Sequence, residues 1–116
     1  MDDVTSSQIG ICQKFGADYL ACDLNLKIGI SKDFDPTKYP LNGLRHPPEG
    51  DTTGWYIWSG KEFSDKSDFF VPLHAVHLLS KADILVKYLG LSPGWRFLVA
   101  PGHEDVWEDK SLLTSQ

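Results

Sequence analysis

Two histidines three residues apart, His74 and His77, are the side chains of this sequence best suited to chemistry. On a helix this spacing brings both imidazoles to one face, where they can converge on a metal ion or a proton. A metal site needs at least a third ligand, which Asp68, Glu104 or Asp105 would supply. His-x-x-His is a weak pattern, and no glutamate stands between the two residues as it does in zinc peptidases. A small metal-dependent or acid-base enzyme is therefore an alternative hypothesis, and one half-buried and one solvated histidine is the simpler interpretation.

Other signatures of catalysis or cofactor binding are missing from the sequence. Ser59 follows Trp58 and precedes Gly60 without the Gly-x-Ser-x-Gly elbow of hydrolases, and no glycine-rich dinucleotide or phosphate loop occurs. Cys12 and Cys22 have no neighbours that would lower a thiol pKa. We expect both thiols to be reduced, because the first residues carry two acids and do not resemble a secretory signal. The sequence thus predicts a soluble protein with reduced thiols, no catalytic residue, no metal and no cofactor.

Acidic side chains gather in two short segments, 62–68 and 104–109. The net charge is -5 and the pI is about 5.2, which disfavours nucleic-acid binding and anionic membranes, since both need basic surfaces. Acids on one side of the fold would instead attract a basic protein; the alternative is that they are ordinary solvated acids. The predicted partner contacts are these acids and three loop residues: Tyr39, Arg45, His46, Glu62, Asp65, Asp68, Glu104, Asp105, Glu108 and Asp109.

All four tryptophans lie between Gly54 and Asp109, and two of them follow a glycine, at Gly54-Trp55 and Gly94-Trp95. Each Gly-Trp pair opens a short apolar run, which predicts a turn followed by a strand with a large side chain to cover. We expect at least two tryptophans in the core. Exposed Trp58 and Trp107 would instead suit a sugar-stacking platform, so a carbohydrate-binding domain is a third hypothesis.

Apolar residues alternate with polar ones over 19–30, which predicts a long strand or a hairpin turning near residues 23–25. Further strands are expected at 55–58 and 95–100, with 104–107 returning beside the latter and Val106 pointing inward. Helical segments are expected at 72–80, with Pro72 in the first turn, and at 83–89, burying Ile84, Leu85 and Tyr88. The proline-rich stretch 31–53 is expected to be a long loop, and 1–18 to be weakly ordered apart from a possible short helix near 7–15.

With 116 residues the chain fits a single domain, and no apolar run is long enough to span a membrane. The pattern predicts a small α+β domain over 1–116, with a mostly antiparallel sheet and one or two short helices packed on one face.

Four sequence blocks resemble the Imm33-type bacterial immunity proteins. They are Gly54-Trp55-Tyr56-Ile57-Trp58-Ser59-Gly60-Lys61-Glu62, Phe70-Val71-Pro72-Leu73-His74, Lys87-Tyr88-Leu89-Gly90-Leu91-Ser92-Pro93-Gly94-Trp95-Arg96-Phe97-Leu98 and Glu104-Asp105-Val106-Trp107. The four blocks lie within residues 54–107, so the resemblance covers roughly the second half of the chain. It implies a small cytoplasmic α+β protein without catalytic residues that binds and neutralises a cognate toxin of a polymorphic toxin system.

Overall fold

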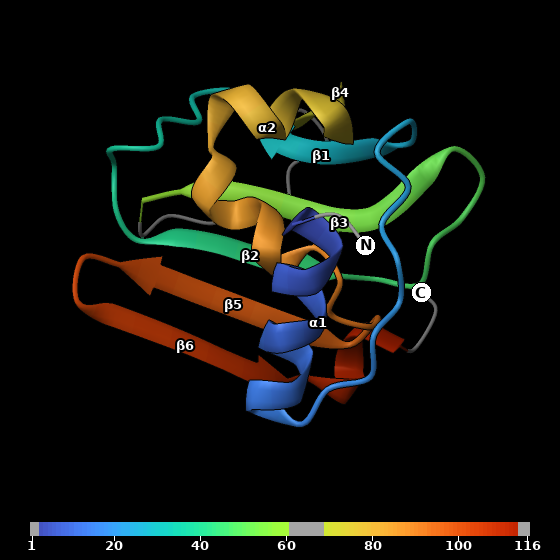
Figure 1. Ribbon diagram of the computed structural model, residues 1–116. Helices are drawn as coiled ribbons and strands as arrows, with labels where there is room; N and C mark the ends of the chain where they lie inside the picture. The colour runs from blue at the N-terminus through green and yellow to red at the C-terminus, as the bar shows by residue number, and fades with distance from the viewer. Residues whose placement is uncertain (1–2, 61–68, 114–116) are drawn as a thin grey trace.

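One mixed sheet organises the protein (Figure 1). The structure is a computed structural model that describes residues 3–60 and 69–113. Within them the strands run in the order β4-β1-β3-β2-β5-β6, and β1 with β3 is the one parallel pair. The predicted α+β class with a mostly antiparallel sheet is therefore confirmed. The strands are β1 (Lys27–Ser31), β2 (Leu41–Arg45), β3 (Thr52–Ser59), β4 (Phe70–His74), β5 (Trp95–Ala100) and β6 (His103–Glu108).

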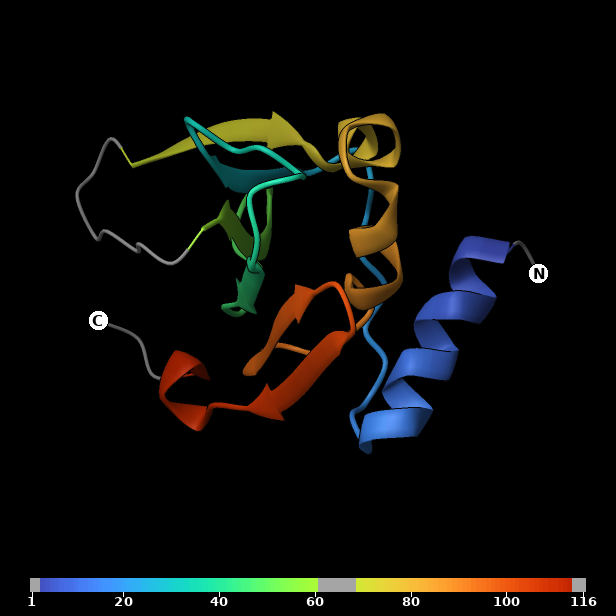
Figure 2. The same cartoon turned by 90° about the vertical axis from the view of Figure 1, so that its left-hand side faces the viewer.

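Short helical segments cover one face of this sheet, as the edge-on view shows (Figure 2). Three of them follow one another after β4: the 3₁₀ turn η1 (Ala75–His77), the single α-turn α2 (Leu78–Lys81) and the 3₁₀ helix η2 (Asp83–Tyr88). Helix α1 (Asp3–Phe15) packs against η2. A last 3₁₀ turn, η3 (Lys110–Leu113), follows β6. None of the described helices is long and apolar enough to cross a membrane.

Strand β3 shows how the tryptophans build the core. Trp55 and Ile57 point toward the helical layer and are buried there, and the Trp55 indole N–H donates to the carbonyl of Leu89 at 3.0 Å. Tyr56 and Trp58 alternate to the opposite face, as period two requires. On that side Trp58 packs with Leu44 and Leu112 in a second, smaller cluster. The sheet is thus covered mainly on one face and partly on the other.

The two cysteines are free thiols in buried positions. Cys12 donates a weak hydrogen bond from Sγ to the carbonyl of Gly90, at 3.4 Å. Burial is the main cause that raises the pKa of both thiols, that of Cys22 to about 11. Neither side chain is therefore an activated nucleophile.

The expected strand at 19–30 is wrong over its first half. Only Lys27–Ser31 is a strand, and Tyr19 makes a single bridge with Leu91. A turn interrupts the alternation because the Asp23 carboxylate accepts the Asn25 N–H at 2.9 Å and the Asp23 carbonyl accepts the N–H of Leu26. The turn that we considered near 23–25 is present, but it does not join two strands.

The expected loop over 31–53 also hides a strand. β2 lies between β3 and β5, and all five of its residues are buried because the sheet is covered on both sides at this point. Asn42, Gly43 and Arg45 have weak strand preference, and prolines flank the segment, so propensity gave no signal for it. Tertiary pairing overrides that preference.

The expected helix over 72–80 begins later than predicted. Residues Phe70–His74 form β4, an edge strand whose one partner among the described strands is β1. Pro72 is tolerated there because an edge strand leaves one side unpaired. The short helix considered near 7–15 is confirmed and is longer than predicted, since α1 spans Asp3–Phe15 and buries Ile11 and Cys12.

Predictions for the second half of the chain were more accurate. Both strands after the Gly-Trp pairs are present, and β6 pairs antiparallel with β5 with Val106 buried, as expected. The segment 83–89 is helical but 3₁₀ in form, and it buries Leu85 and Tyr88. Ile84 was expected to be buried, yet it is 52% exposed.

Candidate partner-binding surface

The acids predicted near 104–109 do not form one patch. Side chains alternate along β6, so Glu104 faces the helical layer, where it meets Tyr88 and Lys14, whereas Asp105 lies on the opposite face. Beyond the strand, the Asp109 carboxylate accepts a hydrogen bond from Arg96 Nη1 at 3.2 Å. The predicted negative surface is therefore divided between two sides of an edge strand.

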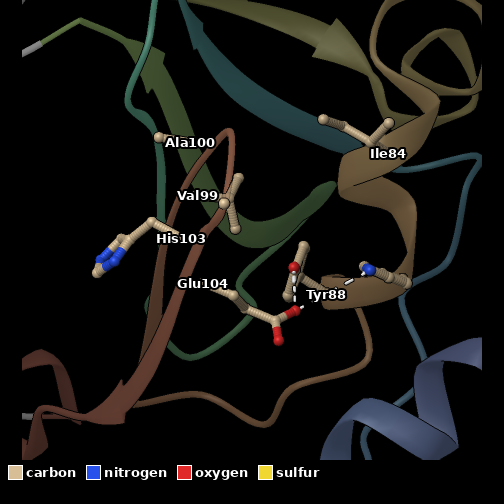
Figure 3. A pocket seen from close by; sticks show the side chains of 8 residues that line it. Ile84, Tyr88, Val99, Ala100, His103 and Glu104 are labelled. Atoms are coloured by element: carbon tan, nitrogen blue, oxygen red, sulfur yellow. Dashed lines mark hydrogen bonds and ion pairs between the residues drawn. The ribbon is translucent and has the colours of Figure 1, made fainter.

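Glu104 is already engaged within the molecule (Figure 3). Its Oε1 lies 2.7 Å from Lys14 Nζ, and its Oε2 accepts a short hydrogen bond from the Tyr88 hydroxyl. Lys87 Nζ lies 4.0 Å from the same Oε2. Figure 3 shows His103 pointing away from this network. Glu104 thus fastens β6 to α1 and η2, and its charge is largely compensated.

We expect Glu104→Gln to destabilise the fold in a pH-dependent way. Hydrogen bonds from Lys14 and Tyr88 lower the pKa of the Glu104 carboxyl. A lowered folded-state pKa adds stability above the unfolded-state pKa, near 4.3, and this stability is lost as the pH falls through the folded pKa. Urea unfolding should show a loss of about 1 kcal/mol at pH 7 that shrinks below about pH 4. Asp105→Asn is the matched exposed control; an equal loss at both pH values would contradict this assignment.

The three predicted loop contacts lie far apart. Tyr39 and His46 are exposed but flank opposite ends of β2, roughly 20 Å apart at the rise of a strand. His46 Nδ1 lies 3.2 Å from the carbonyl oxygen of Leu112. Arg45 is only 1% exposed, so the structure places it inside the core rather than at a binding surface. The predicted contacts Glu62, Asp65 and Asp68 lie outside the described residues.

The histidine pair and the exposed tryptophans also differ from expectation. His74 ends a strand and His77 ends a 3₁₀ turn, so they do not share a helix, and their ring centroids are 6.4 Å apart. Within residues 3–60 and 69–113, no group of three His, Cys, Asp or Glu side chains is arranged to hold a metal ion. Trp58 is 4% exposed, so the expectation that it forms an open sugar platform is wrong. Trp107 is half-buried, with the Arg96 guanidinium 5.4 Å from its ring centre.

Large apolar side chains are exposed on the helical layer instead. Val76, Leu79 and Ile84 come from η1, α2 and η2 and lie among the exposed large hydrophobic residues. A 3₁₀ helix repeats every three residues, so Leu85 and Tyr88 point inward together while Ile84 and Lys87 point outward together. The sequence pattern missed this surface because an α-helical period would bury Ile84.

Two hollows flank Ile84. The hairpin-side hollow, of about 410 Å³, lies between η2 and the β5–β6 hairpin, and its walls include Val99, Ala100 and Glu104 (Figure 3). The α1-side hollow, of about 490 Å³, lies between η2 and the start of α1. Both share Ile84 and Lys87, so Ile84 forms a crest between two depressions.

Comparison with known proteins supports one family. The family model described as the Imm33-like domain matches residues 7–109. The match spans most of α1, the whole sheet and the segments η1, α2 and η2. No curated protein and no solved structure matches the chain.

Proposed function

The chain belongs to the Imm33-like family, and from this premise we propose that it is an immunity protein that binds a cognate toxin and neutralises it by direct contact. It acts without catalysis and in the cytoplasm, as one component of a polymorphic toxin system. The observation that carries the proposal is the family match over 7–109, which takes in nearly all of the described fold. No catalytic residue is assigned.

The described surface supports a protein partner. Exposed Leu79 and Ile84 line the hollows of the helical layer, and apolar groups next to concave surface are typical of protein interfaces. In such interfaces a few central side chains supply most of the binding free energy, and the surrounding polar groups exclude water. A standard interface covers about 800 Å² on each partner, so binding here would mask a large part of a toxin's functional surface.

The charge of the chain supports a basic toxin. A net charge of -5 speeds encounter with a positively charged protein and disfavours acidic ones. Asp105 and Glu108 are exposed on β6 and, together with Tyr39 and His46, remain the proposed contacts for a toxin that docks away from the helical layer. Rim charges affect the association rate and the selectivity more than they affect the lifetime of the complex.

The test of this proposal is complex formation with the toxin domain encoded beside the chain in its genome. We expect the two purified proteins to co-elute as a complex in size-exclusion chromatography. Calorimetry should give a dissociation constant of roughly 1 µM or lower, because the toxin has to be held at cellular concentrations. A basic toxin domain from an unrelated system is the matched control and should elute separately. Separate elution of the cognate pair at tens of micromolar would overturn the proposal.

A further inference from the structure

We propose that the η2 crest, meaning Ile84 with the hollow on either side of it, is the docking site for a basic side chain of the toxin. This inference rests on the proposed function and assigns it to one surface. A lysine or arginine of the partner enters the hollow between α1 and η2, and an apolar partner side chain covers Ile84. The argument uses the exposure of the crest, the lining of the hollow and the placement of nearby charges.

The crest exposes apolar side chains to solvent. Ile84 is the most exposed large hydrophobic side chain of the described residues. Leu79 is also exposed and lines the hollow between α1 and η2. The inward neighbours Leu85 and Tyr88 hold η2 on the core, so the crest is fixed from below. A rigid apolar side chain between two depressions is the geometry of an interface anchor, since its ordering loses little entropy on binding.

The α1-side hollow combines apolar walls with carboxylates. Val4, Leu79 and Val86 line it, and Asp3 and Asp83 stand on its two opposing elements. Across the described part of the chain, neither aspartate makes an ion pair. A lysine or arginine fits this lining, because its aliphatic stem packs on the apolar walls while its cation meets the carboxylates.

Lys87 lines the same hollow and its charge opposes a cation, but its ammonium is turned toward the other side of the crest. Lys87 Nζ lies 4.0 Å from Glu104 Oε2 and 5.3 Å from the centre of the Tyr88 ring. Both contacts belong to the hairpin-side hollow, where Glu104 and Tyr88 are wall residues. The α1-side hollow therefore keeps an acidic character and selects a basic occupant.

Binding kinetics with the purified cognate toxin test this site by two separate readouts. We expect Ile84→Ala to weaken binding about tenfold or more, mainly through faster dissociation, because a central apolar contact is lost. The double variant Asp3→Asn, Asp83→Asn should slow association several-fold at low salt and flatten its salt dependence. Ile84, Asp3 and Asp83 are all exposed, so thermal unfolding should confirm that both variants retain the fold.

Matched controls separate this site from other surfaces. Leu20→Ala removes another exposed aliphatic side chain, and Asp105→Asn removes an exposed acid on the other face of the sheet; each should change affinity less than twofold. If Asp105→Asn slows association while Ile84→Ala binds like the wild type, the docking site is wrong but the proposed function stands. If the wild type does not bind the toxin, the proposed function fails and this inference with it.

Discussion

Arg45→Ala is expected to lower the free energy of unfolding by about 3–5 kcal/mol, since it removes a buried cation that backbone carbonyls surround. Arg45 Nε donates to the carbonyl of Thr53 at 3.0 Å, and Nη1 donates to the carbonyls of Leu20 and Leu91 at 2.9 Å each. Further bonds reach Leu89 and Ala21. Without the guanidinium these acceptors lose their donor in a dry environment, and a cavity opens beside Trp55.

Urea unfolding followed by tryptophan fluorescence measures this loss. Arg45→Lys keeps the charge but offers one compact ammonium in place of a planar fork, so we expect it to recover less than half of the loss. Arg45→Met keeps the length of the side chain but has no hydrogen-bond donors. It tests whether side-chain volume alone accounts for the stability that Arg45 contributes. A wild-type midpoint for Arg45→Ala would show that the carbonyls of residues 20, 21, 53, 89 and 91 need no common donor.

Gly54→Ala is expected to cost about 3 kcal/mol or more, because two penalties coincide at the first Gly-Trp pair. The φ angle of Gly54 is +89°, which side chains rarely adopt. A Cβ atom at this position would lie 1.9 Å from the carbonyl oxygen of His46. His46 itself donates its N–H to the Gly54 carbonyl at 2.9 Å, so the two backbones cannot separate without breaking the β2–β3 pairing.

Gly94→Ala at the second Gly-Trp pair is the matched control for this prediction. Its φ angle is +96°, but the nearest atoms to a Cβ there belong to the side chain of Leu113, at 3.2 Å or more. We expect a loss of about 1–2 kcal/mol from backbone strain alone. Thermal or urea unfolding of both variants measures the difference in stability. Equal losses of stability would mean that the backbone moves away from the Gly54→Ala contact with the His46 carbonyl at no cost.

The sequence predicted the second half of the fold better than the first half. Trp55, Trp95 and Val106 lie on strands with clear alternation and turn signals, so local pattern and tertiary structure agree there. β2 was not predictable, because Asn42 and Gly43 become buried only through pairing with β3 and β5. Gly43 in particular leaves space for the Phe97 ring, which a Cβ would meet at 2.2 Å. Such a requirement comes from a neighbour 54 positions away and leaves no local signal.

The candidate surface was less predictable than the fold. A charge pattern identifies acidic segments but not the cations that compensate them, and Lys14 meets Glu104 only because α1 packs beside the hairpin. Arg45 looked like a recognition residue in a loop, yet its loop is a central strand. Ile84 looked like a core residue because the distinction between 3₁₀ and α-helical periods depends on packing, which a short segment does not reveal.

Hydrogen–deuterium exchange of the chain with and without its cognate toxin tests the central claim most directly, because it locates a bound protein on this fold. The account predicts slower exchange over η2 (Asp83–Tyr88) and the first turn of α1 in the complex, with the β6 edge unchanged. Protection confined to the sheet face around Tyr56 and Trp107, or no protection anywhere at saturating toxin, would contradict it.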